Sequence, residues 1–451
     1  MPKQNRYIFV CQNCGYQAPK WMGRCPDCGQ WNSLVEEIQE SAKRSKRLSS
    51  TGSPQTLDAI SLDPEQRYAT GIDEFDRALG GGLVPGSLIL LGGDPGIGKS
   101  TLILQVAGRI SEKGGNALYF SGEESPQQIK MRAERLAVHC KNLYIISGTC
   151  IENLFESMDR FKPDLLIIDS IQTIYTEALP SAPGSVGQLR EVSARLLRWA
   201  KETNTPTFLI GHVTKDGAIA GPKVLEHLVD TVLYFEGDRG HLFRIVRTVK
   251  NRYGSTNEIG VFEMKETGLE EIGNPSRLFL EERPANTSGS VVIPCMEGTR
   301  PLLVEIQALV GSSPLGMPRR TAIGVDHNRI SLLVAVIGKR MGIEMGDQDI
   351  FVNVAGGLKV DEPAADLGIV SAMVSSFLDK PVAQDMAIFG EIGLAGEVRG
   401  VNHPELRIRE SKKLGFSRCL LSQSNLENCK RLPGMELTGI DNVKDLVERL
   451  F

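Results

Sequence analysis

Short apolar runs alternate with amphipathic stretches through the middle of the chain. Two segments between these runs, 101–113 and 188–203, repeat apolar residues at helical spacing. The runs are apolar at nearly every position, which is typical of parallel strands covered on both faces: 88–91, 117–120, 143–146, 165–168 and 207–210. The alternation predicts an α/β domain with right-handed crossovers. Two later runs, 231–235 and 243–250, flank a turn-like Gly-Asp-Arg-Gly and predict an antiparallel extension of the sheet.

The last third of the chain again mixes both patterns. Strands are expected at 302–310, 351–354, 386–389 and 418–421, and helices at 330–341, 365–376 and 405–414. A stretch rich in Pro, Ser and Asn near 275–290 marks a boundary, and a Ser-rich basic stretch marks another. The predicted organisation is a cysteine-bearing segment at 7–35, a flexible basic linker at 36–56, an α/β domain at 57–274 and a second α/β domain at 285–451.

Composition restricts the class of protein. The 451 residues are 41% hydrophobic and 24% charged, which excludes a fibrous or fully disordered chain. The net charge of −4 excludes a uniformly basic coat, although residues 1–50 hold eight lysines and arginines against four acidic residues. No apolar run approaches the roughly 18 residues of a membrane span, and the first residues lack a signal-peptide layout. We therefore expect a cytoplasmic protein without a membrane partner.

A phosphate-binding loop is the strongest chemical signal. The stretch from Gly93 to Thr101 follows a predicted strand, opens a predicted helix and matches G-x-x-x-x-G-K-[ST]. Backbone N–H groups of such a loop surround phosphates at the positive end of the helix. Lys99 is expected to reach the β- and γ-phosphates of ATP, and the Ser100 hydroxyl to bind Mg²⁺. The predicted nucleotide-binding residues are Gly93, Asp94, Pro95, Gly96, Ile97, Gly98, Lys99, Ser100 and Thr101.

Acidic residues at the ends of later strands supply the remaining chemistry. Asp169 ends the apolar run 165–168 and is predicted to be the second Mg²⁺ anchor. Glu123 and Glu124 follow another strand, and either one can orient the attacking water; a solvated acidic loop is the alternative. His212 ends the strand 207–210 and is interpreted as a γ-phosphate sensor, or as an ordinary packed histidine.

Four of the nine cysteines are clustered near the N-terminus. They form two Cys-x-x-Cys pairs, Cys11 with Cys14 and Cys25 with Cys28, and a glycine follows each pair. Such pairs suit a tetrahedral Zn²⁺ site. A segment this short cannot bury much of a core, so metal binding would supply its folding energy. The spacing does not distinguish a finger that contacts nucleic acid from one that is purely structural or contacts a protein partner.

Two loops on the predicted phosphate side are candidates for DNA contact. They cover 178–187 and 214–223 and are rich in glycine, proline or serine. Lys215 and Lys223 lie in the second loop and are interpreted as phosphate contacts, with ordinary solvated lysines as the alternative.

Taken in order, these motifs resemble those of one family. The cysteine pairs, the phosphate loop, the strand ending at Asp169, the sequence Gly-His-Val-Thr-Lys from Gly211 and Lys-Asn-Arg-Tyr-Gly from Lys250 resemble the bacterial RadA/Sms DNA-repair ATPases. The likeness extends over essentially the whole chain. The family usually carries Phe where this chain has Tyr253, so an aromatic ring is retained.

The resemblance implies roles for several residues. The core is similar to RecA and to the DnaB replicative helicase, which implies a RecA-like ATPase domain behind an N-terminal zinc finger. By that match Glu123, rather than Glu124, positions the water. Lys250 and Arg252 resemble the pair that a neighbouring helicase subunit inserts at the γ-phosphate, as an arginine finger in trans. The loops after the strands resemble the DNA-binding loops of RecA-type rings.

The C-terminal segment resembles the proteolytic domain of Lon protease. The stretch 390–398, Gly-Glu-Ile-Gly-Leu-Ala-Gly-Glu-Val, carries the likeness. Lon-type proteolysis needs a Ser–Lys dyad. The matching positions here are Ala364 and Glu405, so the resemblance implies a Lon-like domain without proteolytic activity.

The expected function is that of a DNA-dependent ATPase in homologous recombination and repair, with ATP, Mg²⁺ and Zn²⁺ as cofactors. The resemblance implies a hexameric ring that moves on single-stranded and branched DNA and promotes branch migration with the RecA recombinase. The alternative is a RecA-like strand-exchange mediator without unwinding activity.

Overall fold

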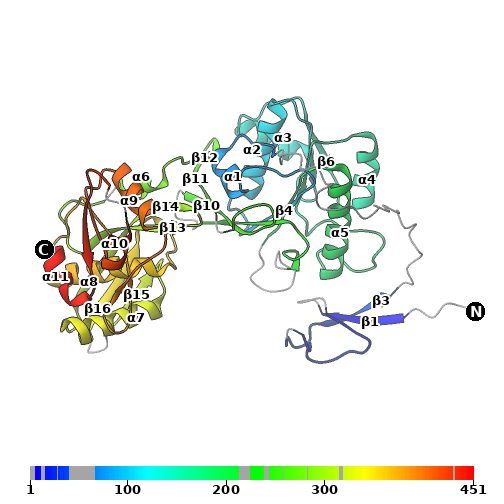
Figure 1. Cartoon of the computed structure of the whole chain (residues 1–451). Coiled ribbons are helices and arrows are strands. Elements are labelled where there is room, and N and C mark those ends of the chain that lie inside the picture. The colour runs from blue at the N-terminus through cyan, green and yellow to red at the C-terminus, as the bar shows by residue number, and fades with distance from the viewer. Residues whose placement is uncertain are drawn as a thin grey trace, which may run out of the picture. The chain divides into compact units, whose positions relative to one another are not determined.

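The computed structural model describes most of the chain, and its parts are coloured along the sequence in Figure 1. The described residues are 6–11, 16–27, 29–39, 67–212, 224–237, 243–256, 258–281, 283–313, 318–429 and 432–451. The chain divides into two compact units, Met1–Glu271 and Ile272–Phe451. Among the described residues, no helix is long and apolar enough to cross a membrane.

The N-terminal segment is a small antiparallel sheet. Its strands are β1 (Arg6–Cys11), β2 (Gln17–Ala18) and β3 (Leu34–Gln39), in the order β2-β1-β3. Among the described residues, its buried core consists of Cys11, Ala18, Cys25 and Leu34, with Phe9 and Met22 partly buried against it. A core this small does not stabilise an independent unit, so the segment depends on a further source of folding energy.

The first unit also holds the predicted α/β domain, built on a nine-stranded sheet in the order β12-β11-β10-β9-β4-β8-β7-β5-β6. Its strands are β4 (Leu88–Gly93), β5 (Ala117–Ser121), β6 (Leu143–Ser147), β7 (Leu165–Asp169), β8 (Thr207–Ile210), β9 (Thr231–Glu236), β10 (Phe243–Asn251), β11 (Ile259–Lys265) and β12 (Gly268–Glu271). The strands from β4 to β9 are parallel, and β10 to β12 extend the sheet antiparallel. The runs 231–235 and 243–250 pair antiparallel with each other as predicted, but β9 is itself parallel to β4, and β11 and β12 were not predicted.

Helices cover both faces of this sheet (Figure 1). They are α1 (Asp73–Ala78), α2 (Lys99–Glu112), α3 (Pro126–Arg135), α4 (Ile151–Arg160) and α5 (Val186–Thr203). Ile89 and Leu91 of β4 enter the core under α1, α2 and α3, whereas Leu88 and Leu90 enter the core under α4 and α5. Because successive strand residues face opposite cores, the strand is apolar at every position, which is the pattern seen in the sequence.

The second unit is built on a seven-stranded mixed sheet in the order β15-β16-β14-β13-β17-β20-β21. Its strands are β13 (Ser290–Glu297), β14 (Arg300–Ser312), β15 (Arg320–Ile323), β16 (Gln348–Val354), β17 (Met386–Ile388), β20 (Arg418–Ser422) and β21 (Glu436–Ile440), and β18 (Glu391–Ile392) pairs with β19 (Val398–Arg399) apart from them. Its helices are α6 (Pro275–Leu280), α7 (His327–Val336), α8 (Asp366–Leu378), α9 (Pro404–Lys413), α10 (Gln423–Asn428) and α11 (Leu446–Leu450).

The helix expected at 330–341 is divided in two. The α-helix α7 ends at Val336, and a π-helical turn continues over Ile337–Met341. Gly342 follows with φ of +71°, a left-handed conformation that glycine adopts readily and that ends a helix. The hydrophobic pattern predicted where this element ends but placed its start three residues late, and it gave no sign of the change in helix type.

Two ion pairs lie beside the positions that correspond to the Lon dyad. Arg407 is fully buried and pairs with Glu362, with 3.0 Å between Nη1 and Oε2. Its Nη1 also donates to the carbonyl of Pro294 at 2.6 Å. Arg329 pairs in the same way with the buried carboxylate of Asp366. Glu362 and Arg407 are two residues along the chain from Ala364 and Glu405 respectively, so the pair joins the two segments that contain these positions.

We predict that Arg407→Ala destabilises the second unit by about 3–5 kcal/mol, because removing one partner of a buried pair leaves the other charge uncompensated. Hydrogen exchange of amides in β13 and β14 measures this loss. Arg409→Ala is the matched control, since that side chain is exposed on the same helix and lies 3.7 Å from Glu405. Equal protection in the two variants would contradict the assigned role of the pair.

Candidate nucleotide site

The phosphate-binding loop joins the end of β4 to the start of α2. Gly96 and Gly98 have φ of +78° and +119°, in the left-handed region that favours glycine. A Cβ atom on Gly98 would lie 2.8 Å from the Met264 methyl and 3.3 Å from the Phe235 ring. The loop therefore needs glycine at that position for conformation and for space. Helix α2 begins directly after Gly98, so its free N–H groups face the loop.

Lys99 is held inside this loop. Its Nζ donates to the carbonyl of Gly93 at 2.8 Å and to that of Asp94 at 2.9 Å, and the residue is 3% exposed. Burial lowers the pKa of Lys99 to about 8, and the nearby carboxylates of Asp169 and Asp94 oppose this decrease. An ammonium held this way is ready to exchange carbonyl partners for phosphate oxygens.

Strand register brings Asp169 to the carboxyl ends of the parallel strands, where the phosphate-binding loop also lies. Asp169 is paired with Ile210 of β8, and Ile210 is paired with Leu91 of β4, two residues before the loop begins at Gly93. Asp169 is nearly buried at 6% exposure. A carboxylate and the hydroxyl of Ser100 at this end of the strands are hard oxygen donors, which is the donor set that Mg²⁺ prefers. The residues present therefore fit a magnesium ion beside the nucleotide phosphates.

A hydrogen-bonded chain leads from Asp169 to helix α3. The Tyr119 hydroxyl donates to Oδ2 of Asp169, and Arg132 donates from Nη2 to the Tyr119 oxygen at 3.2 Å. Arg132 also pairs with Glu124, with 2.9 Å between Nη2 and Oε2. Burial, and next the charge of Asp169, raise the pKa of Tyr119 well above its ordinary value, so the phenol stays neutral. The sequence analysis did not identify Tyr119 or Arg132; a tyrosine inside a buried strand was the available signal, because a buried hydroxyl needs a partner.

The two acids after β5 have different surroundings. Glu123 accepts a hydrogen bond from the Ser170 hydroxyl, and its Oε1 lies 3.5 Å from Nε2 of His212. The hydrogen bond from His212 is the largest cause that lowers the pKa of Glu123 to about 2, so this carboxylate stays ionised throughout the physiological range. Glu124 instead pairs with Arg132. Glu123, Ser170 and His212 thus form a group next to the Asp169 edge, and Glu124 is not part of it.

Lys250 and Arg252 lie toward the other end of the strands, at the amino ends of the parallel strands, whereas the phosphate-binding loop is at their carboxyl ends. Lys250 is paired with Val232 of β9, and Val232 is paired with Leu90 of β4. From Leu90 to Gly93 the strand rises by about 10 Å, at ~3.3 Å per residue. Both cations are therefore at least this far along the sheet from the phosphate-binding loop of their own chain.

Both cations are anchored by neighbouring acceptors at that end of the strands. Lys250 donates from Nζ to the carbonyls of Glu226 at 2.7 Å and Val229 at 2.9 Å. Arg252 lies 3.3 Å from the buried carboxylate of Asp230, and its side chain remains 55% exposed. Arg252 is thus anchored on Asp230 while more than half of its side chain remains exposed.

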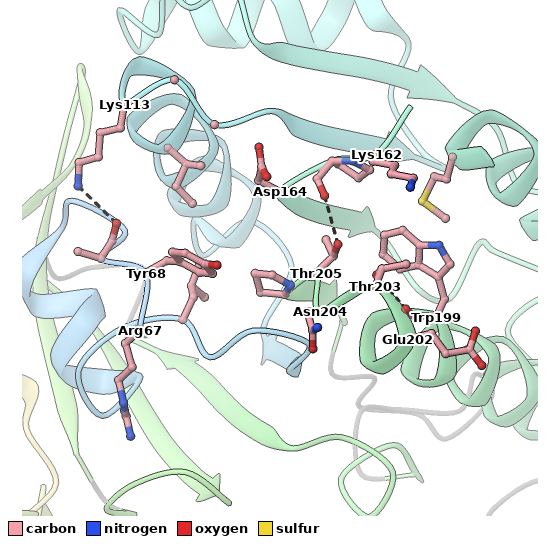
Figure 2. A pocket seen from close by; sticks show the side chains of 18 of the residues that line it. Arg67, Tyr68, Lys113, Lys162, Asp164, Trp199, Glu202, Thr203, Asn204 and Thr205 are labelled. Atoms are coloured by element: carbon pink, nitrogen blue, oxygen red, sulfur yellow. Dashed lines mark hydrogen bonds between the residues drawn. The ribbon is translucent and has the colours of Figure 1, made fainter. Parts of the chain in front are cut away.

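A cleft with a volume of about 1080 Å³ lies at the amino ends of the parallel strands. Figure 2 shows Tyr68 and Trp199 on its walls, with Lys113 and Asp164 at its margin. The C-terminal ends of α2 and α5 line it. Because the phosphate-binding loop is at the carboxyl ends of the strands, this cleft is separate from the nucleotide site.

Two of the four predicted zinc ligands fall within the described residues. Cys11 and Cys25 are both buried in the small N-terminal core. The chain turns tightly after Cys25, where Gly29 donates from its N–H to the Cys25 carbonyl at 2.9 Å and has φ of +73°. Cys14 and Cys28, like the predicted DNA contacts Lys215 and Lys223, lie outside the described residues.

Comparison with known protein families divides the chain in the same way. Residues 9–36 match a rubredoxin metal binding domain, residues 54–218 match an AAA domain, and residues 333–451 match the C-terminal proteolytic domain of Lon protease (S16). The first unit thus carries a zinc ribbon and a RecA-like ATPase core, and the second carries a Lon-like domain.

Curated relatives match nearly the full length of the chain. The protein named DNA repair protein RadA in Bacillus subtilis is 51% identical, and the alignment covers 97% of both chains. Proteins of the same name are 52% identical in Halalkalibacterium halodurans and 49% identical in Listeria monocytogenes, and each alignment covers 98% of this chain and 97% of the relative. The chain belongs to the RadA family of DNA repair proteins.

Proposed function

We propose that this chain is a DNA-dependent ATPase that works as a cytoplasmic hexameric ring of the DnaB type. It moves on single-stranded and branched DNA, and promotes branch migration and processing of recombination intermediates with the RecA recombinase. The observation that carries the proposal is the location of Arg252 and Lys250, at the edge of the sheet opposite the phosphate-binding loop. In this location they serve a nucleotide bound to a neighbouring chain.

The position of Arg252 supports assembly for a physical reason. An arginine finger must reach the γ-phosphate, and the sheet separates Arg252 from the site of its own chain. Asp230 fixes the base of the side chain, and more than half of the guanidinium-bearing side chain remains exposed. A cation arranged this way neutralises transition-state charge only at an interface between copies, which couples hydrolysis to the arrangement of subunits.

Within one chain, the proposed roles follow from the surroundings of each group. Lys99 neutralises charge on the β- and γ-phosphates of ATP. Ser100 and Asp169 hold Mg²⁺, which supplies further neutralisation of phosphate charge when bound. Glu123 is ionised and orients the attacking water, and His212 beside it senses the γ-phosphate. Lys215 and Lys223 are proposed to contact DNA phosphates.

The second unit is proposed to be a scaffold for assembly without proteolytic activity. Ala364 is buried and has no nucleophilic atom, and Glu405 supplies a carboxylate in place of an amine. Arg407, two residues after Glu405, pairs with Glu362, two residues before Ala364. The four-cysteine segment is proposed to hold one Zn²⁺ through Cys11, Cys14, Cys25 and Cys28.

The Lys99→Ala chain should lose ATP turnover and strand displacement while keeping its fold, because the substitution removes the cation that faces the phosphates. Turnover, displacement of a strand from forked DNA of either polarity and circular dichroism measure this. Lys113→Ala, at the other end of the same helix, should behave like the unsubstituted chain. ATP turnover without displacement on any fork would favour the strand-exchange mediator, and near-normal turnover of Lys99→Ala would refute the nucleotide site.

One zinc ion per chain is expected in the purified protein. The Cys25→Ser/Cys28→Ser variant removes two of the four thiolates and should lose the metal, whereas Cys140→Ser in the ATPase domain should retain it. Elemental analysis measures the content directly. Zinc retained at the full level in the double variant would show that these cysteines are not the ligands.

Arg252→Ala chains should bind ATP and hydrolyse it at a rate lower by roughly 10³–10⁵, the range seen for arginine fingers. Mixing them with Lys99→Ala chains should restore part of the turnover, because some interfaces then pair an intact phosphate loop with an intact arginine. Arg109→Ala, which removes a surface arginine that is 61% exposed, should remain active without a partner. No recovery in mixtures that crosslinking shows to contain both chains would place the action of Arg252 elsewhere.

A further inference from the structure

A buried tyrosine touches the proposed magnesium ligand and has no part in the roles assigned so far. Tyr119 lies in the middle of β5, is fully buried, and its hydroxyl donates to Oδ2 of Asp169. A phenylalanine would fill the same apolar space between the strands. The hydroxyl is therefore not explained by packing, and its contact with Asp169 needs an account of its own.

Arg132 fixes the direction of this hydrogen bond. A guanidinium can only donate, so the contact of 3.2 Å from Nη2 uses the Tyr119 oxygen as an acceptor. The single hydroxyl proton is then left for Asp169. Because Tyr119 engages Oδ2, the other carboxylate oxygen, Oδ1, remains available for a metal ion or its water ligands.

Arg132 lies in helix α3 and contacts the acidic loop that precedes this helix. Its Nη1 donates to Oε1 of Glu124 at 3.1 Å, and its side chain is 14% exposed. Glu124 is the direct neighbour of Glu123, the proposed water-orienting acid. One continuous set of contacts therefore joins the loop that holds Glu123 to the carboxylate of Asp169.

We propose that Tyr119 is a positioning residue for Mg²⁺ binding, and that Arg132 holds Tyr119 in the orientation this requires. The inference rests on the proposed ATPase function and adds a residue pair to it. The hydrogen bond holds the Asp169 carboxylate in one rotamer, so that Oδ1 faces the nucleotide edge before the metal arrives. Partners that orient a metal ligand in this way typically contribute 10–100-fold to metal affinity or activity.

Tyr119→Phe removes the hydroxyl and keeps the ring. We expect the Mg²⁺ concentration for half-maximal binding of a fluorescent ATP analogue to rise about 10-fold or more. Binding of the analogue in EDTA should be unchanged, because the phosphate-binding loop is not altered. Arg132→Gln should shift the midpoint in the same direction by a smaller factor, since Tyr119 then keeps its proton but loses its constraint.

Tyr144→Phe is the matched control. Tyr144 lies on the neighbouring strand β6, is 42% exposed and contacts the Phe161 ring rather than the nucleotide edge. Equal Mg²⁺ midpoints for the Tyr119 and Tyr144 variants would overturn the inference, as would an equal loss of analogue binding with and without Mg²⁺ in Tyr119→Phe. A separate result, no Mg²⁺-dependent binding by the unsubstituted chain, would refute the proposed ATPase itself and this inference with it.

Discussion

The ATPase domain depends on keeping one lysine ammonium almost entirely out of water. An isolated charge in that place would be strongly unfavourable, so the surrounding structure must supply partners for it. The loop turns two of its own carbonyls toward Lys99, which requires the left-handed glycines around it. The parallel sheet then brings the carboxylate of Asp169 to the same edge. The sheet order, the glycines of the loop and the start of α2 together supply the hydrogen-bond acceptors and the nearby carboxylate that stabilise the Lys99 ammonium.

Much of the fold could be predicted because a strand that is buried on both faces is apolar at nearly every position, and such a run is easily recognised in the sequence. The runs at 88–91 and 207–210 are continuous apolar strands, and their structured counterparts β4 and β8 differ from prediction by two residues at most. Other strands were not recognised. β13 contains Pro294, which is unusual inside a strand, and β12 is a short edge strand that ends in two exposed glutamates. Neither carries a periodic signal strong enough to identify it.

The candidate site divides in a similar way. Lys99, Ser100 and Asp169 follow strands within short linear motifs, so local sequence was enough to propose them. The position of Arg252 relative to its own phosphate loop depends on strand order, which only the fold supplies. Tyr119 and Arg132 are 13 residues apart in the sequence, and the hydrogen bond between them joins a strand to a helix. No local sequence pattern predicts such a contact. The roles of Lys215 and Lys223 stay predictions.

The buried pair of Arg407 and Glu362 has a consequence for which substitutions the second unit tolerates. Either partner alone would leave a charge unpaired in the interior, at a cost of about 3–5 kcal/mol, which is a large part of the stability of a typical domain. A substitution of Arg407 alone is therefore costly, whereas replacing both partners together with apolar side chains of similar volume need not be. Since Arg407 lies on α9 and Glu362 lies just before α8, the pair couples the two segments, and a change in one is tolerated only with a matching change in the other.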